Sequence, residues 1–490
     1  MLLEPGTTCW RRETSGRAAL LIDMAAYFDA AMVAMGKARH SIHLLNWAFE
    51  PDTLFHPQPG CTGPQDDRIA NFLKRLAREN PKLDVRILCW QSAAPVAATQ
   101  NWFPIADRWE FKGSNVKFVL DGKLPMGASH HQKAIIVDDA IGFCGGGDIG
   151  PDRWDTPLHL DDDDRREIKK NSKKDFASRH EVMGVVEGAP ARALGALFRE
   201  RWARRTGEIL PEPPKVRPAW PAGVTPQFAD VEVGLSRTVA AWNHHPEVRE
   251  VEALHLAAIR EARACIYMEN QYFTSPLIAG ALAARLAEPG GPEVVLIGTE
   301  QSPSYFDRMT MDGTRVKFIE RLKRADKHGR FQAYSPVTTL GRIIIVHAKL
   351  TIVDDRLLRI GSANINNRSM GFDSECDMSF EAAGRAGTGN RREIATLRTR
   401  LLAHWLGCDE AIMEAAIRKA GAIGPGVEAL RNAGYARLRP IQLKPLGPLG
   451  ELVADYHLGD PLGPHDSWRP WSRKRAAASA DRRGREAAKA

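Results

Sequence analysis

The chain has 490 residues, of which 43% are hydrophobic and 26% are charged, as in ordinary soluble globular proteins. These values exclude a chain that is disordered throughout, a collagen-like repeat and a disulfide scaffold, and the length suffices for about two or three domains. Lys and Arg number 68 against 60 Asp and Glu, so the formal charge is +8. Such an excess suits an anionic partner, either nucleic acid or an acidic membrane surface, and its position along the chain therefore matters.

The cysteines and the apolar runs of the sequence indicate in which cellular compartment the protein is expected. Seven cysteines are scattered without a CxxC pair, which indicates reduced core thiols rather than a disulfide framework or a zinc site. No apolar run reaches the ~18 residues of a membrane span, and the first residues show no basic segment followed by an apolar one. We therefore expect a cytoplasmic or peripheral membrane protein, with secretion by a non-Sec route as the alternative.

Taken in chain order, the predicted elements repeat. Each half shows a helix, a strand, a second helix, an apolar strand, a motif strand and a glycine turn, at offsets of 262 − 38 = 224 and 347 − 131 = 216 residues. The copies are the helices 23–37 and 247–261, the strands 38–49 and 262–273, the strands 83–90 and 292–299, and the motif strands 131–139 and 347–355. Two copies of one α/β unit are the simplest explanation.

The boundaries between these copies are marked by composition. We expect an N-terminal half over 1–210, a Pro-rich linker over 211–228 and a C-terminal half over 229–435, with a further helix over 187–205 at the end of the first half. The predicted fold class is α/β: two similar repeats packed pseudo-twofold as a bilobal monomer, with mixed sheets flanked by helices and one active site at the interface.

Two polar segments are expected to be solvated. The insertion 159–175 is nearly all charged, and its four consecutive Asp are more typical of a solvated surface than of a calcium site. Residues 436–490 are Pro/Gly-rich and then basic, and we expect them to be partly disordered. The last stretch, 472–490, has seven Lys/Arg and two Asp/Glu, so it carries +5 of the total +8.

Both halves contain His-x-Lys-x4-Asp followed by a glycine turn. The first copy has His131, Lys133, Asp138 and Asp148, and the second has His347, Lys349, Asp354, Ser362 and Asn364. Residues two apart on a strand share a face, so His and Lys of each copy project together, whereas the two motif aspartates lie at odd offsets and are expected to be structural. One such motif arises easily by chance, but two copies inside a longer repeat indicate function.

This set of side chains suits a phosphodiester. Two lysines neutralise the non-bridging oxygens, one imidazole attacks phosphorus, and the other protonates the leaving alcohol. We expect Lys133, Lys349, Asn364, Asp148 and Ser362 to bind the phosphate. Each histidine needs an acidic partner to fix its tautomer, and the candidates are Glu375 and Glu181.

At these residues the sequence resembles the phospholipase D superfamily, whose mark is the duplicated HKD motif. The likeness extends to the blocks 130–156, 266–273 and 347–370, with the motif cores at 126–153 and 342–369, and it covers roughly residues 5–440. The segment 179–188 resembles the family's histidine-acid segment, with Glu181 where an Asp is usual.

The resemblance implies a metal-independent ping-pong reaction through a phosphohistidine. It implies that His131 is the nucleophile, oriented by Glu375, and that His347 is the general acid, oriented by Glu181, although the symmetry of the repeat leaves the two histidine roles open from the residues alone. The implied activity is hydrolysis of phosphatidylcholine-type lipids to phosphatidate, with possible transfer to an alcohol, and no cofactor or metal is expected.

Other functions and partners follow from the same motifs. The alternatives are a cardiolipin-synthase-like phosphatidyltransferase, a phosphodiesterase acting on nucleic acid, and a non-catalytic scaffold, against which the intact motifs argue. We expect a phospholipid substrate at a membrane surface, no nucleic acid and a monomer. Trp47 and the pair Trp102-Phe103 would suit an apolar rim for lipid entry, or equally the packing of core or loop.

Overall fold

The computed structural model describes residues 1–57, 68–92, 104–166, 177–304, 307–384, 386–443 and 446–489. The first half contains eight strands and four helices within these residues. The strands are β1 (Arg11–Ile22), β2 (Ser41–Asn46), β3 (Asp84–Trp90), β4 (Val116–Asp121), β5 (Ala134–Val137), β6 (Ile141–Gly145), β7 (Arg179–His180) and β8 (Val182–Glu187). The helices are α1 (Met24–Met35), α2 (Ile69–Glu79), α4 (Pro104–Trp109) and α5 (Ala189–Thr206).

The second half repeats this order with additions. Its strands are β9 (Phe228–Val239), β10 (Val248–Arg249), β11 (Cys265–Glu269), β12 (Glu293–Ile297), β13 (Phe331–Pro336), β14 (Ile345–Val346), β15 (Leu350–Val353), β16 (Leu357–Gly361), β17 (Glu375–Glu381) and β18 (Leu438–Pro440). Its helices are α6 (Glu250–Glu261), α7 (Pro276–Ala287), the π-helix η1 (Arg308–Asp312), α9 (Gly313–Ala325), α10 (Asn367–Gly371), α11 (Gly387–Leu406), α12 (Glu410–Ala420) and α13 (Ile423–Asn432).

Sixteen of the described strands join into one mixed sheet, in which β10 pairs with β9, and β7 and β14 form a separate parallel pair. Its order is β18-β13-β12-β11-β15-β16-β17-β9-β1-β8-β6-β5-β2-β3-β4, so the two halves meet where the long strands β1 and β9 pair antiparallel. Going outward from that junction, both sides show the same succession of strands. The pairs β2–β3 and β11–β12 are parallel, and β2–β5 and β11–β15 are antiparallel. The expected α/β class, with a mixed sheet flanked by helices, is confirmed.

The motif strands are short, wholly buried and hydrophobic. Ala134–Val137 and Leu350–Val353 each lie at the centre of one side of the sheet, between two hydrogen-bonded neighbours. Branched apolar residues suit such central strands because both faces are covered. Each motif strand then turns through two aspartates with positive φ, Asp138 and Asp139 in one copy and Asp354 and Asp355 in the other, which matches a tight type I′ hairpin.

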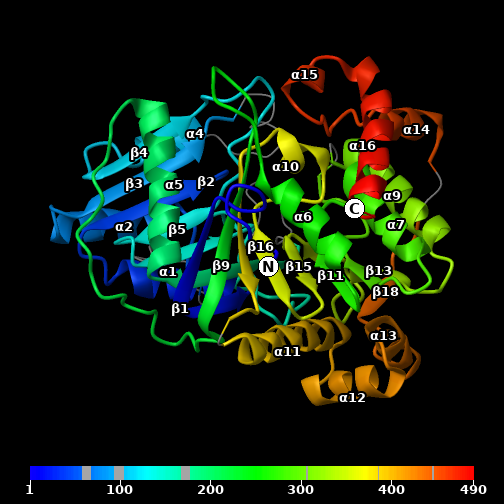
Figure 1. Ribbon diagram of the computed structural model, residues 1–490. Helices are drawn as coiled ribbons and strands as arrows, with labels where there is room; N and C mark the ends of the chain where they lie inside the picture. The colour runs from blue at the N-terminus through cyan, green and yellow to red at the C-terminus, as the bar shows by residue number, and fades with distance from the viewer. Residues whose placement is uncertain are drawn as a thin grey trace.

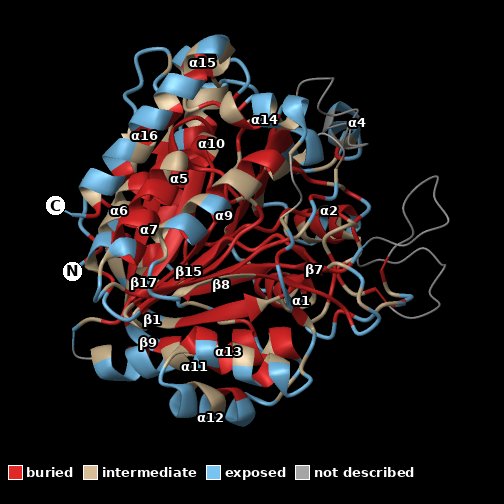
Figure 2. Cartoon of the chain, turned by 90° about the vertical axis from the view of Figure 1, so that its right-hand side faces the viewer, coloured by how far each residue is buried: buried red, intermediate tan, exposed pale blue. Residues whose placement is uncertain are grey.

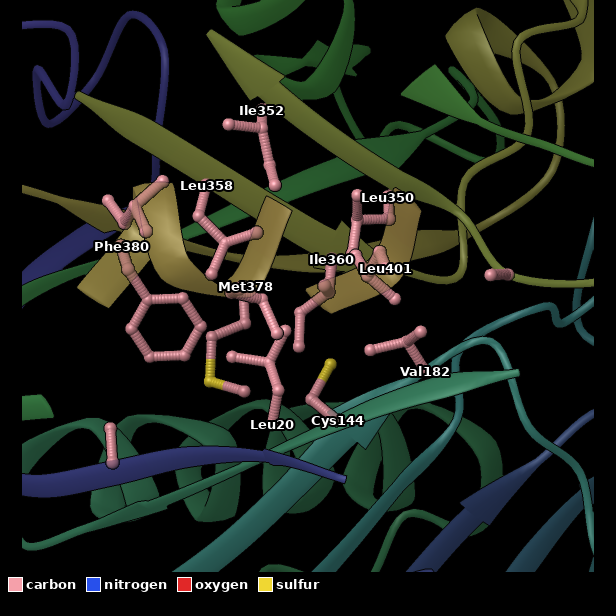
Figure 3. Packing of buried hydrophobic residues seen from close by; sticks show 14 of the residues in the cluster. Leu20, Cys144, Val182, Leu350, Ile352, Leu358, Ile360, Met378, Phe380 and Leu401 are labelled. Atoms are coloured by element: carbon pink, nitrogen blue, oxygen red, sulfur yellow. The ribbon is translucent and has the colours of Figure 1, made fainter. Parts of the chain in front are cut away.

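The sheet folds over so that its two sides pack face to face. A central cluster contains Leu20, Cys144 and Val182 from the first half together with Ile360 and Met378 from the second, and Figure 3 shows these side chains interdigitating. The approach is close at Gly184, where an added Cβ would lie 2.4 Å from Ile360 Cδ1 and 2.5 Å from Met378 Cε. Burying each large side chain here contributes about 1.5–3 kcal/mol, so the contact between the halves is a principal source of stability.

Helices cover the two outer faces and the edges of the central layer. Helices α1 and α2 share a cluster with the outer face of the first half, and α6, α7 and α9 share one with the second. Helices α5 and α11 contribute to the central cluster. Figure 1 shows the arrangement, and Figure 2 shows the buried strands enclosed by helices whose outer sides are exposed. The helices expected over 23–37, 247–261 and 187–205 are confirmed.

The C-terminal region is more ordered than we expected. It forms α14 (Pro448–Asp455), α15 (Pro464–Ser467), the 3-10 helix η2 (Pro470–Ser472) and α16 (Arg473–Ala487). Helix α16 lies against α7 (Figure 1), and the approach is close enough that a Cβ on Gly484 would meet the carbonyl oxygen of Leu277. We expected this region to be partly disordered, and the structure places helices over much of it because small side chains give the basic segment a face that packs.

The insertion over 159–175 is also not purely solvated. His159, Asp163 and Arg166 are at most 5% exposed, and residues 167–176 lie outside the described part of the chain. The six cysteines within the described ranges are free.

Candidate active site

The two motifs approach one another from β5 and β15. His131 is the most accessible motif side chain, at 17% exposed, whereas His347 is 8% exposed and Lys133 and Lys349 are each 1% exposed. Each lysine ammonium folds back to donate to the carbonyl oxygen of its own motif histidine. The four side chains therefore form a compact, almost dry group that opens to solvent at His131.

The acidic partners of the histidines are crossed between the halves. Glu375 of the second half accepts from His131 Nδ1 of the first, at 2.9 Å, and Glu181 of the first half contacts His347 Nδ1 of the second, at 2.5 Å. Both carboxylates are at most 1% exposed. Each motif histidine thus presents Nε2 away from its glutamate, and neither half alone holds both its motif histidine and the glutamate that contacts it.

Backbone hydrogen bonds also join each motif histidine to the opposite half. The N–H of His131 donates to the carbonyl of Ser374 at 3.0 Å, and the N–H of His347 donates to the carbonyl of His180 at 2.8 Å. Ser374 and His180 each precede the crossed glutamate. The parallel pair β14–β7 extends this contact in the second motif. The position of each histidine is therefore set by the opposite half.

Burial and charge together shift the acid–base properties of the site. Burial, assisted by the charge of Lys133, lowers the pKa of His131, and burial with the charge of Lys349 lowers the pKa of His347. Burial raises the pKa of Glu375, opposed by Lys133 and Lys349, and burial raises the pKa of Glu181, opposed by Lys349. The charge of Lys349 also acts on His131, and that of Lys133 acts on His347, so the two motifs face each other.

The two lysines differ in how easily they lose their charge. Burial lowers the pKa of Lys349 to about 7, although Glu181 opposes the shift. Burial also lowers the pKa of Lys133, which Asp148 opposes from 3.5 Å. Lys349 is therefore the cation of this site that is closest to losing its proton near neutral pH.

The motif aspartates hold backbone rather than substrate. Asp138 accepts from the N–H groups of residues 39–41, and Asp354 accepts from those of residues 263–265. Each carboxylate therefore fastens the turn after its motif strand to the start of the neighbouring strand, β2 or β11. This is the structural placement expected for both residues.

Two residues expected to bind phosphate are occupied otherwise. Asp148 accepts from the N–H groups of Trp47 and Ala48 and faces Lys133, and its negative charge disfavours a phosphate contact. Ser362 Oγ donates to Glu375 Oε2 at 2.5 Å, so it positions the partner of His131. Phosphate binding by these two residues stays a prediction, and the sequence does not reveal that buried neighbours already use both groups.

The side chain of Asn364 is available to contact a ligand. It is 4% exposed, and its Oδ1 has no hydrogen-bond partner among the described residues. A buried amide without a partner is uncommon and suits a ligand contact. Asn364 follows the second glycine turn, where the sequence placed it at the phosphate.

The structure adds cations and an amide that the sequence analysis did not assign. Arg153 is near enough that its charge lowers the pKa of His347 and of Lys349, and Arg179 also acts on His347. Gln271 accepts from Lys349 Nζ at 3.3 Å. Arg153 lies in the segment RWDT (153–156), and Gln271 lies in the segment ENQYF (269–273). Both segments accompany the motifs in the sequence, and this was the signal that could have assigned the two residues to the site.

The expected aromatic rim is seen in part. The Trp47 ring stacks on Trp90 with centroids 5.4 Å apart, and it meets the His131 ring edge-on at 6.5 Å. Trp47 is thus beside the accessible histidine. The pair Trp102-Phe103 lies outside the described residues.

Comparison with known proteins decides the family. The family profile described as "Cardiolipin synthase, PLD-like domain" matches residues 255–388, which include the second motif. Phospholipase D A of Dictyostelium discoideum is 25% identical over 442 residues, covering 78% of this chain and 33% of that protein. Phospholipase D alpha 3 of Arabidopsis thaliana is 24% identical over 509 residues, covering 76% of this chain and 62% of that protein.

This chain belongs to the phospholipase D superfamily. A solved structure, phosphatidylserine synthase of Haemophilus influenzae Rd KW20, shares its fold with a TM-score of 0.55 at 14% identity, over 90% of this chain and 92% of that one. The chain spans about a third of the length of the first curated superfamily relatives, with 33%, 29% and 28% covered. Within the described residues, no helix is long and apolar enough to cross a membrane.

Proposed function

We propose that the chain is a phosphodiesterase of the phospholipase D type, which cleaves the distal phosphodiester of a glycerophospholipid such as phosphatidylcholine to phosphatidate and the head-group alcohol. The observation that carries the proposal is the pair of crossed contacts His131–Glu375 and His347–Glu181 beside two buried lysines. Two oriented imidazoles and two cations in one dry group provide a nucleophile, a proton donor and charge neutralisation for one phosphate.

In the first step, His131 Nε2 attacks phosphorus. Glu375 accepts the Nδ1 proton of His131, which leaves the Nε2 lone pair free, and the lowered pKa keeps the ring neutral. A P–N bond forms as the bond from phosphorus to the head-group oxygen breaks. His347 gives its proton to that oxygen, since the negative diester raises the pKa of the imidazole beside it.

In the second step, His347 removes a proton from water, and the oxygen of that water attacks phosphorus. The P–N bond breaks, phosphatidate leaves, and His131 is restored. An alcohol in place of water yields a phosphatidyl-alcohol by the same route. Lys133, Lys349 and Asn364 bind the non-bridging oxygens throughout, and they supply electrostatic stabilisation without a proton transfer of their own.

The substrate panel that tests this proposal contains phosphatidylcholine vesicles, phosphatidylglycerol vesicles and single-stranded DNA, each with and without ethanol. We expect phosphatidate from phosphatidylcholine, and phosphatidylethanol when ethanol is present, at a rate that chelators do not change within the assay. Cleavage of DNA alone, with no lipid product, would contradict the proposal.

A second candidate is a phosphatidyltransferase that uses phosphatidylglycerol, favoured by the match of residues 255–388 to the cardiolipin synthase profile. The chemistry is the same, with a lipid hydroxyl replacing water. Cardiolipin formed from phosphatidylglycerol vesicles faster than phosphatidate from phosphatidylcholine would select this candidate. In both cases we propose that the substrate is presented at a membrane surface.

A further inference from the structure

Four side chains from distant segments converge behind the active site. They are Asp23 before α1, His159 in the loop that follows β6, His180 of β7 and His404 of α11. One ligand atom from each lies within 4.8 Å of all the others. We call this group the histidine cluster. Asp23, His159 and His180 are at most 1% exposed, so the cluster is shielded from solvent.

Each member of the histidine cluster turns a polar atom toward the others. Asp23 Oδ1 pairs with His180 Nδ1 at 2.9 Å, and Asp23 Oδ2 is 3.7 Å from His159 Nε2. Asp23 Oδ2, His159 Nε2 and His404 Nε2 are buried and have no hydrogen-bond partner in the described part of the chain. Three such atoms around one point are costly unless a further group binds them, because each has lost its water.

A second set of carboxylates fixes the tautomers. His159 Nδ1 contacts Asp155 Oδ2 at 2.9 Å, and His180 Nε2 contacts Glu269 Oε2 at 2.9 Å. Glu269 is itself held by the indole N–H of Trp405 at 2.8 Å. A proton on the outer nitrogen of each ring leaves a lone pair on the inner nitrogen. The carboxylate–histidine arrangement is the one that supports metal-bound imidazoles.

We propose that the histidine cluster binds a divalent transition-metal ion, with Zn²⁺ as the best match. Three imidazole nitrogens and one carboxylate oxygen form a tetrahedral Zn²⁺ set, and ligand distances of about 2.0–2.2 Å place neighbouring ligand atoms ~3.3–3.5 Å apart. The four ligand atoms lie within 4.8 Å of one another, and Asp23 Oδ2 is 3.7 Å from His159 Nε2, so a small contraction brings the set to that spacing. Ca²⁺ and Mg²⁺ prefer oxygen ligands, so three imidazole nitrogens disfavour both ions.

The site is structural and not catalytic. All four positions are filled by protein, so no open position remains for substrate or water. Asp23, His159 and His180 come from the first half and His404 from the second, so the ion fastens the halves together. The Glu181 N–H donates to Asp23 Oδ1 at 3.1 Å, the Asp23 N–H donates to the Glu181 carbonyl at 2.8 Å, and Glu181 contacts His347. The ion therefore fixes the position of Glu181, and through it that of the general acid His347, without contacting the phosphate.

The competing state is a proton instead of a metal. In that state His180 is an imidazolium between Asp23 and Glu269, and no ion is taken up. The two states differ in metal content and in spectrum, which makes them separable without any activity assay.

The test begins with the full chain purified without a metal-affinity tag or chelator. Elemental analysis is expected to give about one Zn²⁺ per chain, and exchange with Co²⁺ is expected to give the visible absorption of a tetrahedral Co²⁺ site. A folded chain that contains no stoichiometric metal, and that takes up neither Zn²⁺ nor Co²⁺ after dialysis, would overturn the proposal.

Variants locate the ion. His404→Gln is expected to reduce the metal content at least tenfold, and Asp155→Asn is expected to weaken Zn²⁺ binding about 10–100-fold, as for other residues behind metal ligands. The control is His255→Gln, because His255 is also a buried histidine with an unpartnered nitrogen but lies in α6, outside the cluster. Unchanged metal content in His404→Gln, or equal loss in the control, would contradict the assignment. If His404→Gln does not fold, the Co²⁺ spectrum of the wild-type chain still decides between metal and proton.

Discussion

At the scale of single residues, the proposed catalysis depends on a carboxylate held against each imidazole by the opposite half. Glu375→Gln removes the charge that fixes the His131 tautomer and keeps the side-chain size. We expect kcat to fall about 10²–10⁴-fold, the range for a lost acid–base contribution. Steady-state release of choline from phosphatidylcholine measures this.

The matched control for Glu375→Gln is Ser379→Ala on the same strand, whose buried hydroxyl makes no hydrogen bond among the described residues. It should leave kcat unchanged. A Glu375→Gln chain with the kcat of the wild type would show that the contact with His131 is not used.

The lowered pKa of Lys349 predicts an alkaline limb in the activity profile. Burial brings that pKa to about 7, so the ammonium is charged below this pH and neutral above it. Because only the charged form neutralises phosphate, kcat/KM should fall as the pH rises through about 7. The measurement is kcat/KM on phosphatidylcholine between about pH 6 and pH 9.

Lys349→Arg separates this effect from the histidines, since a guanidinium stays protonated over the whole range. Its kcat/KM is expected to be lower overall but without the limb near pH 7. An identical limb in Lys349→Arg would assign the titration to another group.

At the scale of elements, the motif strands were predictable and the last helix was not. Ala134–Val137 and Leu350–Val353 are branched apolar runs ended by paired aspartates, and those local signals coincide with buried strands and tight turns. Helix α16 has a strongly charged sequence, and its order comes from the close approach of Gly484 to Leu277 and of Asp481 to Gly280 on α7. Such a contact between distant segments leaves no periodic signal in the composition of the tail.

The packing of α16 is testable through Gly484. A Leu at this position would collide with the carbonyl oxygen of Leu277, which is backbone and cannot move aside alone. We expect Gly484→Leu to lower the free energy of unfolding by about 1–3 kcal/mol and to expose the C-terminal segment to protease. Limited proteolysis and thermal unfolding measure both effects.

Arg482→Leu is the control, since this residue is exposed on the same helix. Equal protease sensitivity in Gly484→Leu and Arg482→Leu would show that α16 is not docked.

At the scale of the whole molecule, the halves are held together by the central cluster between the two sides of the sheet. Gly184 marks a close approach of the two halves, since a Cβ there would lie 2.4 Å from Ile360. Gly184→Leu is expected to cost about 1–3 kcal/mol of unfolding free energy and to lower activity, because the crossed contacts need both halves in register. Denaturant unfolding measures the cost.

Gly290→Leu serves as the control because the space around Gly290 is open and the residue is exposed. A loss of stability in Gly290→Leu equal to that in Gly184→Leu would mean that the substitution acts through the unfolded chain and not through the interface.

The shared site was predictable because the repeat places similar residues at similar offsets in both halves. The positions of Asp148 and Ser362 were not, because what a buried polar group contacts depends on neighbours that are distant in sequence. The histidine cluster is the extreme case, with members at positions 23, 159, 180 and 404 and no ligand spacing to reveal it. The excess charge is also clarified, since the +5 of residues 472–490 falls mostly on a docked helix and not on a basic groove.

The most direct test of the account is the turnover of phosphatidylcholine by His131→Ala and His347→Ala chains that unfold at the wild-type temperature. If the two motifs form one site, each single substitution removes a step that the other motif cannot replace, and hydrolysis and phosphatidylethanol formation should both fall by at least about 10³-fold. Full turnover by either variant would contradict a single site shared by the two halves.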